Sequence, residues 1–195
     1  VQFGASLIAV STSFEANQAD VGDASGGAIA VYGGANVTEC TFSRNSAGDF
    51  GGAIAVGADE DCCARLVVEA SAFTQNSAGN GGAINVATNG VVTLSDGCTL
   101  TENVATTKGG GLRIGSGEGY VSSTEFVDND APESPDAHKN DAGTLECTGC
   151  PGGEIDVDGC ETVDFCQSCV CVPAPTFAPT ETPISAPTSL PTVMP

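Results

Sequence analysis

The stretch from Phe73 to Val86 reads FTQNSAGNGGAINV and is the clearest copy of a frame that recurs along the chain. The frame is a bulky apolar residue, two variable residues, Asn, a polar turn, a Gly-Gly pair and a short apolar strand. Further copies lie at Phe14–Val31, Phe42–Val56 and Leu100–Ile114, and the frame begins again at Phe126–Asn129. Self-similarity at a period of roughly 20–50 residues is typical of solenoid architectures.

Two positions of the frame recur at a fixed offset. The apolar anchors are 28, 31, 27 and 26 residues apart, and each Asn follows its anchor by three residues. The anchors are Phe14, Phe42, Phe73, Leu100 and Phe126, and the Asn residues are Asn17, Asn45, Asn76, Asn103 and Asn129. After each Gly pair, apolar residues alternate with small or polar ones, which predicts a strand with one buried face.

Each repeat thus supplies about three short strands separated by corners. Strands this short can pair if every repeat is one coil of a solenoid whose like positions stack about 4.8 Å apart. We therefore predict an all-β fold, a right-handed parallel β-helix of about four to five coils in residues 1–130. The anchors would form an internal ladder, the Asn side chains would hydrogen-bond from coil to coil at a corner, and the Gly pairs would turn the chain.

The totals exclude several classes of function. Of the 195 residues, 25 are Asp or Glu and 5 are Lys or Arg, for a formal charge of −20. A surface this acidic repels phosphate backbones, so we expect no nucleic-acid partner. No apolar run reaches the roughly 18–20 residues of a membrane-spanning helix. Ten cysteines indicate an oxidising compartment. Because no initiator Met or signal peptide is visible, we interpret the sequence as a fragment or a processed piece.

The repeats resemble a known family. FSRNSAGDFGGAIAV and FTQNSAGNGGAINV are similar to the FxxN and GGAI repeats of chlamydial polymorphic outer-membrane proteins, and to related β-helix repeats in large surface proteins of algae and other microbes. The resemblance covers roughly residues 7–130. It implies a β-helix and a secreted, cell-surface or cell-wall location, and the family members are adhesin-like passengers. An extracellular carbohydrate or protein ligand is the partner that this resemblance implies.

Two acidic segments are weak candidates for Ca²⁺, which takes six to eight oxygen ligands. The first is the corner that contains Asp59, Glu60 and Asp61. The second contains Asp156 and Asp158 and imitates the start of an EF-hand loop, but its twelfth position is Phe165, where that loop needs a bidentate Glu. We interpret both as solvated acidic turns, and we expect no catalytic residue, cofactor or established metal site.

The cysteines fall into two groups. Cys40 and Cys98 occupy the same inward position two coils apart, about 9.5 Å at the rise of the ladder, so we expect two buried free thiols, because a disulfide needs Cα atoms within about 7 Å. The disulfide candidates are Cys62, Cys63, Cys147, Cys150, Cys160, Cys166, Cys169 and Cys171. Two CxxC units in residues 131–172 leave zinc as an alternative. We expect this segment to be a disulfide-linked cap that covers the last coil.

The last 23 residues, 173–195, alternate Pro with Thr or Ser. This composition cannot bury a core, so we expect a disordered, extended linker of the kind that is often O-glycosylated. It resembles the linkers of secreted proteins of diatoms and brown algae. The only N-glycosylation sequon starts at Asn36, just before an expected strand.

Parallel β-helices also host polysaccharide lyases, hydrolases and epimerases, which need a base or paired carboxylates on one face. Arg113 faces outward, but the matching positions of the preceding coils hold Asn85, Ala55 and Ala30. The sole His, His138, follows the last repeat, and we expect it to be exposed and without a catalytic role. We therefore expect a non-enzymatic extracellular module for adhesion or for binding of carbohydrate or protein. The alternatives are a fragment of a polysaccharide-acting enzyme whose catalytic coils lie outside this chain and a calcium-stabilised module.

Overall fold

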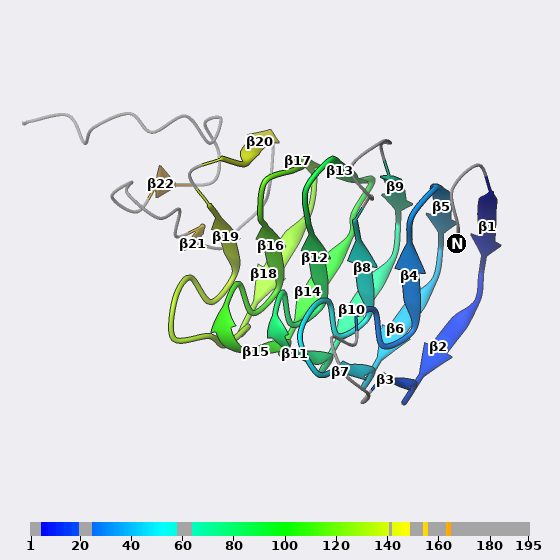
Figure 1. Ribbon diagram of the computed structural model, residues 1–195, viewed down its shortest axis with the longest axis horizontal. Helices are drawn as coiled ribbons and strands as arrows, with labels where there is room; N and C mark the ends of the chain where they lie inside the picture. Colours follow the sequence, from blue (N-terminus) through cyan, green and yellow to red (C-terminus); the bar gives the residue numbers. More distant parts are fainter. Residues whose placement is uncertain are drawn as a thin grey trace, which may run out of the picture.

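The computed structural model describes residues 5–19, 25–57, 64–140 and 142–148, and the backbone of residues 154–155 and 163–164. All regular elements in these segments are β-strands, and those up to residue 148 form a parallel β-solenoid of about five coils. Figure 1 shows the coils side by side along the long axis, from blue β1 at one end to yellow β20 at the other. The expected architecture is therefore confirmed. The acidic corner with Asp59–Asp61, the segment with Asp156 and Asp158, and the Pro-rich tail lie outside the described residues.

Each complete coil contributes one strand to each of four parallel sheets, which we call A to D. Sheet A consists, in spatial order, of β1 (Ser6–Val10), β5 (Gly34–Thr38), β9 (Ala64–Glu69), β13 (Gly90–Ser95), β17 (Glu118–Ser122) and β20 (Thr144–Thr148). Sheet B consists of β2 (Ser13–Glu15), β6 (Thr41–Ser43), β10 (Ala72–Thr74), β14 (Thr99–Thr101) and β18 (Glu125–Val127).

Sheets C and D complete the coils. Sheet C consists of β3 (Gln18–Ala19), β7 (Ser46–Ala47), β11 (Ser77–Asn80) and β15 (Val104–Lys108). Sheet D consists of β4 (Ile29–Val31), β8 (Ile54–Val56), β12 (Ile84–Val86), β16 (Leu112–Ile114) and β19 (Ala137–Lys139). A separate antiparallel pair joins β21 (Glu154–Ile155) to β22 (Val163–Asp164). The expectation of about three strands per repeat was too low, because the polar residues after each Asn form the short strands of sheet C.

The anchors of the repeat form the predicted internal ladder in sheet B. Phe42 lies opposite Phe14 on one side and Phe73 on the other, and the register continues through Leu100 to Phe126. The rings of Phe14, Phe42 and Phe73 stack with centroids 4.7 Å apart and interplanar angles of 4° and 3°. Each ring therefore repeats at the strand spacing and fills the space between sheets B and D.

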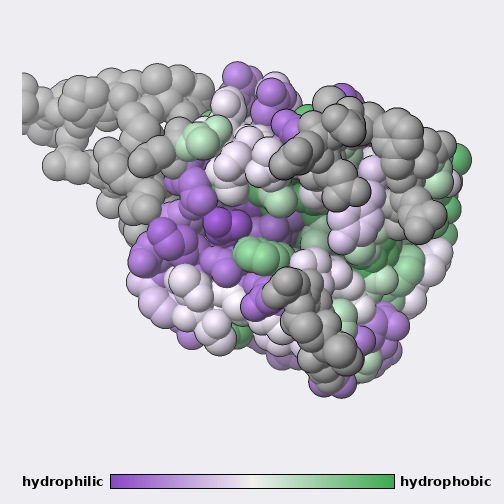
Figure 2. Space-filling view, viewed as in Figure 1, coloured by the Kyte–Doolittle hydropathy of each residue, from purple (hydrophilic) through white to green (hydrophobic). Residues whose placement is uncertain are grey.

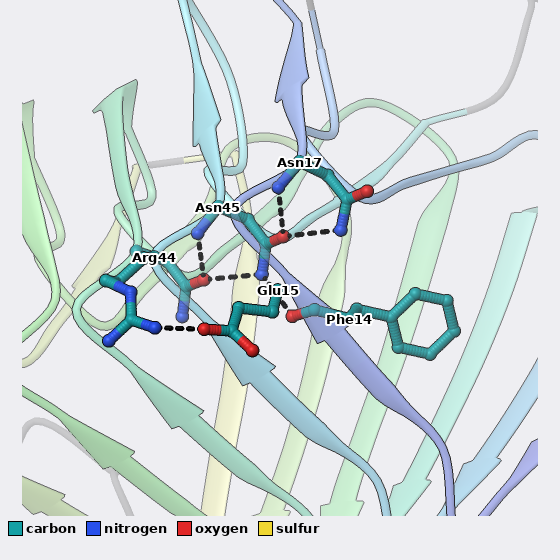
Figure 3. Close-up of polar contacts among 6 residues, drawn as sticks. Phe14, Glu15, Asn17, Arg44 and Asn45 are labelled. Carbon is teal, nitrogen blue, oxygen red and sulfur yellow. Dashed lines mark hydrogen bonds and ion pairs between the residues drawn. The ribbon is translucent and has the colours of Figure 1, made fainter.

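The Asn residues form the second predicted ladder, at the corner between sheets B and C. The side-chain amide of Asn76 donates to Oδ1 of Asn103 at 2.9 Å and to the carbonyl of Phe42 at 3.0 Å. Oδ1 of Asn76 accepts both the backbone and the side-chain N–H of Asn45. Figure 3 shows the same pattern one coil earlier, where Asn17 donates to Asn45. The ladder thus satisfies polar groups that the corner buries.

The Gly pairs form the corner that leads into sheet D. Gly51 has a φ of +64°, which glycine adopts without a Cβ clash. Gly52 has a different reason to lack a side chain, because a Cβ would lie 2.1 Å from the carbonyl oxygen of Gly82 in the next coil. The first Gly therefore permits the turn, and the second permits the close approach of successive coils.

One irregularity of the sequence has its expected cause. Leu94 stands one residue further from its anchor than the corresponding Val68 and Val121, yet it lies opposite both of them in sheet A. The additional residue is at the corner after β13, where Asp96 and Gly97 both have positive φ. An insertion at a corner leaves the inward register intact, as the solenoid requires.

The ladders extend past residue 130, the expected end of the repeats. Strand β19 pairs with β16, and β20 pairs with β17, so sheet A reaches Thr148. Leu145 and Cys147 of β20 belong to the buried core. Cys147, which we placed among the disulfide candidates of the cap, is disulfide-bonded. The other seven candidates lie outside the described residues.

The two thiols expected in the interior are there. Cys40 and Cys98 are free and buried, with exposed fractions of 1% and 0%. Each thiol lies within hydrogen-bonding distance of a nearby carbonyl oxygen, at 3.3 Å from Thr38 and 3.1 Å from Ser95. Both occupy the small-residue position beside the anchor ladder, where Ser71 stands in the coil between them.

Candidate functional site

Sheet D presents the most distinctive outer surface of the solenoid. The middle residue of each of its strands points away from the core, and these residues lie in one row: Ala30, Ala55, Asn85, Arg113 and His138. The row changes along the axis from two small apolar residues to three polar ones. In Figure 1 sheet D lies at the front, and Figure 2 shows hydrophilic residues gathered on the side of β16 and β19.

Arg113 is the centre of this row. Its Nη1 donates to Oδ1 of Asn85 at 2.9 Å, and its guanidinium carbon lies 5.8 Å from the centroid of the Phe50 ring, within the range of a cation–π interaction. Burial lowers the pKa of Arg113 below its ordinary value. Nε of Arg113 is buried and has no hydrogen-bond partner in the part of the chain that the structure describes. The guanidinium therefore retains donor capacity that the protein does not use.

Two adjoining hollows lie along the row. The first, of about 180 Å³, extends from Tyr32 to Asn85, and the second, of about 160 Å³, extends from Phe50 and Asn85 to Arg113 and Asn140. They share Phe50 and Asn85 as a common wall. Each is smaller than the roughly 300–1,000 Å³ of a pocket for a drug-sized molecule.

His138 is not exposed, contrary to the sequence-based expectation. It lies on β19 next to Arg113, and its exposed fraction is 0%. Nδ1 lies 3.1 Å from the hydroxyl of Ser134, and Nε2 lies 3.0 Å from Oδ1 of Asn140. The segment after the last repeat folds back over the ring, and single-sequence periodicity gives no signal of such a contact.

A Ser–His–Asn series has the order of a nucleophile, a base and an orienting group. Here Ser134 has an exposed fraction of 3%, and His138 is fully buried. No substrate carbonyl can reach a hydroxyl in that environment. We interpret the series as a buried polar connection that holds the segment after β18 against sheet D.

The remaining sequence-predicted positions do not join this site. Asn36 of the sequon lies within β5, not before a strand as we expected, and its side chain is exposed on sheet A. The Phe and Asn ladders lie inside the solenoid and at its corner, where they stabilise the fold. Among the described residues, no group of three His, Cys, Asp or Glu side chains could hold a metal ion.

Sequence reasoning identified Arg113 and Asn85 as outward neighbours but missed the aromatic wall. Phe50 stands in the turn just before the Gly pair, at a position that holds Asn80 and Lys108 in later copies. Tyr32 stands in the corner after β4. Phe50 lies in register with Ser25 and Asn80, but its aromatic side chain does not recur in the other copies, so the alignment of repeats did not predict an aromatic wall.

One comparison with known proteins supports the repeat. Residues 39–57 match the family described as the Chlamydia polymorphic membrane protein (Chlamydia_PMP) repeat. The match covers β6, β7 and β8 of one coil, including Phe42, Asn45 and the Gly51-Gly52 pair. The repeat takes its name from membrane proteins of Chlamydia, which agrees in a coarse way with a location at a cell surface. No curated protein and no solved structure matches the chain.

In the segments that the structure describes, no helix has the length and apolar character needed to cross a membrane.

Proposed function

We propose that the chain is a non-enzymatic extracellular module of a larger cell-surface or cell-wall protein, and that it binds an acidic carbohydrate on the outer face of sheet D. The observation that carries the proposal is the position of Arg113, a partly buried guanidinium at the edge of a hollow, whose Nε has no hydrogen-bond partner among the described residues. A guanidinium is a planar array of five donors that matches a carboxylate in two-point geometry. A ligand carboxylate would compensate the desolvation that lowers the pKa of Arg113.

The ligand class follows from the walls of the two hollows. Phe50 and Tyr32 offer aromatic surface, and Asn140 offers an amide group. Asn85 has an exposed fraction of only 2% and serves to hold Arg113 in place. A sugar ring carries apolar and hydroxyl faces that suit such walls, and a uronic acid adds the carboxylate. The net charge of −20 repels long polyanions, so we expect short oligouronides to bind in preference to polymers.

The composition of the row argues against glycoside hydrolysis at this site. Hydrolysis of a glycoside needs two carboxyl groups on either side of the scissile bond. The outward residues of sheet D supply none, since they are Ala30, Ala55, Asn85, Arg113 and His138. Binding without turnover is therefore the function that these side chains support best.

Titration calorimetry with short galacturonate and alginate oligomers tests the proposal, with the methyl esters of the same oligomers as neutral ligands. We expect the acids to bind at least tenfold more tightly than the esters, and we expect Arg113→Met to abolish the difference. A tenfold difference in affinity is about 1.4 kcal/mol, just below the roughly 1.5–3 kcal/mol of one hydrogen bond to a charged group. Arg65→Met is the matched control, because Arg65 is exposed on sheet A, away from the hollows. This variant should bind the oligomers as tightly as the native chain does.

Three results would count against the proposal. Equal affinity of the native chain and Arg113→Met for the acids would remove Arg113 from the site. Absence of binding by any oligomer would remove the carbohydrate ligand. Release of unsaturated or shortened sugars during the titration would overturn the non-enzymatic part and favour the polysaccharide-acting alternative.

A further inference from the structure

The first coil of the solenoid leaves its inward residues incompletely covered. Strands β1, β2, β3 and β4 each form the terminal strand of a sheet. Leu7, Phe14 and Ala28 are only partly buried against the core. Their counterparts one coil later, Ala35, Phe42 and Ala53, have exposed fractions of 2%, 0% and 0%. Phe14 stacks on Phe42 through one face.

The Asn ladder has a direction, and it begins at this coil. Each Asn donates its backbone and side-chain N–H groups to Oδ1 of the Asn in the following coil. Asn17 therefore donates to Asn45, but its own Oδ1 accepts no hydrogen bond from the described residues. Figure 3 shows this oxygen directed away from Asn45. The amide is exposed, so among the described residues the first position of the ladder is an acceptor without a donor.

The opposite end of the ladder is closed. The side-chain amide of Asn129 donates to Oδ1 of Asp136 at 2.9 Å. Asp136 belongs to the segment after the last repeat and takes the place that the next Asn would have. An ionised carboxylate accepts hydrogen bonds and donates none. The two ends of the ladder are thus chemically different. At the first coil Oδ1 of Asn17 has no donor among the described residues, whereas at the last coil the amide of Asn129 already has its acceptor in Asp136.

We infer that the N-terminal end of the solenoid is a docking face for one further coil of the same frame, connected on the N-terminal side of residue 5. That coil would place Phe or Leu over Phe14 and an Asn whose two N–H groups donate to Oδ1 of Asn17. It would continue the interface that already joins each coil to the next. This inference is independent of the proposed function, because it concerns different residues at a different end of the molecule.

The ladder chemistry disfavours a second copy of this chain as the occupant. Head-to-tail stacking would bring Asp136, which has no proton to donate, toward the open acceptor of Asn17. Head-to-head stacking would place Oδ1 of Asn17 against the same atom of the other copy. Neither arrangement supplies the missing donors, whereas a coil with its own Asn supplies two.

The test adds a coil to the complete chain. A copy of residues 64–86, which contains Phe73 and Asn76, is fused in front of Val1, so that residues 1–5 form the connecting corner. The other corners between sheets D and A hold between two residues, 32–33, and seven, 57–63, so a corner of five is within the natural range. If the copy stacks, the urea m-value should rise by about one fifth, because m scales with the surface exposed on unfolding, and the amides of β1 should exchange more slowly.

Two matched variants separate stacking from mere extension. A scrambled copy and a copy that carries Asn76→Ala should both give a lower urea midpoint and faster exchange in β1 than the native copy. An unchanged m-value together with unchanged exchange in β1 would overturn the inference, and so would equal effects of the native and scrambled copies. Sedimentation of the unmodified chain as a dimer that Asn17→Ala dissociates would also overturn it, because the face would then pair two copies.

Discussion

The backbone N–H and the side-chain amide of Asn45 both converge on Oδ1 of Asn76, at 3.0 and 2.9 Å. This two-donor contact recurs from Asn17 to Asn129 and joins the corner between sheets B and C in each coil to the same corner of the next. In the interior coils the Asn side chains are fully buried. The ladder is therefore a structural device whose strength depends on its position along the axis.

Asn76→Ala should be much more damaging than Asn17→Ala. Removal of the Asn76 side chain takes the acceptor from the buried backbone N–H of Asn45 and from one of its side-chain N–H groups, and it takes a donor from the carbonyl of Phe42. We expect this to cost about 2–4 kcal/mol. Asn17 is exposed, so water can replace its contact and the loss should stay below about 1 kcal/mol. Urea denaturation of both variants measures the difference, and equal losses would contradict a graded ladder.

Gly82→Ala should disrupt the packing of successive coils. A Cβ at this position would lie 2.3 Å from the carbonyl oxygen of Gly110 and 2.5 Å from that of Val104. These are backbone atoms of the next coil, which cannot move without loss of ladder hydrogen bonds, so we expect a cost of about 3 kcal/mol. Gly34→Ala is the control, because its Cβ would approach only Ser6 Oγ at 3.8 Å and should leave the melting temperature unchanged or slightly raised.

The parts of the fold that repeat were predictable, because repetition turns each position into several independent observations. Five copies at a nearly constant spacing placed the Phe and Asn ladders and even the displaced Leu94, whose additional residue lies at a corner. The strands of sheet C were missed because they are as short as two residues and turn inward only a small Ala, such as Ala47, Ala78 or Ala105. Their pairing follows from the coils on either side and leaves no hydrophobic pattern.

Only part of the candidate site, the pair Arg113 and Asn85, could be predicted from the sequence. Arg113 and Asn85 stand at repeat positions, so alignment of the copies made them neighbours. Phe50 stands at a repeat position that holds Ser25, Asn80 and Lys108 in the other copies, so its aromatic ring was not expected there. His138 reaches the same face through the segment after the last repeat. Where such non-repeating segments fold is decided by tertiary contacts, such as the bond of His138 to Ser134, and a single sequence carries no signal for them.

Asp136→Ala should weaken the last coil, whereas Asp136→Asn should not. The carboxylate accepts from the amide of Asn129, which is otherwise buried at the corner with an exposed fraction of 7%. Loss of the acceptor should cost about 1–2 kcal/mol, and Asn can replace it because its Oδ1 is also an acceptor. Hydrogen exchange in β18 and β19 provides the measurement. Loss of protection in both variants would mean that the charge of Asp136 matters more than its acceptor.

The buried thiol of Cys98 should make stability depend on pH in the alkaline range. Burial raises the pKa of Cys98 above the ordinary thiol value of 9.0. In the unfolded chain the thiol ionises first, so its contribution to stability is complete below pH 9.0 and declines as the pH rises through the higher pKa of the folded state. Urea denaturation between pH 7 and about pH 10.5 should show a steeper alkaline decline for the native chain than for Cys98→Ala. Equal slopes of the free energy of unfolding against pH in the two proteins would contradict the burial of a neutral thiol. Rapid reaction of the folded native chain with a thiol reagent at about pH 8 would also contradict it, because an exposed thiol already ionises in part at that pH.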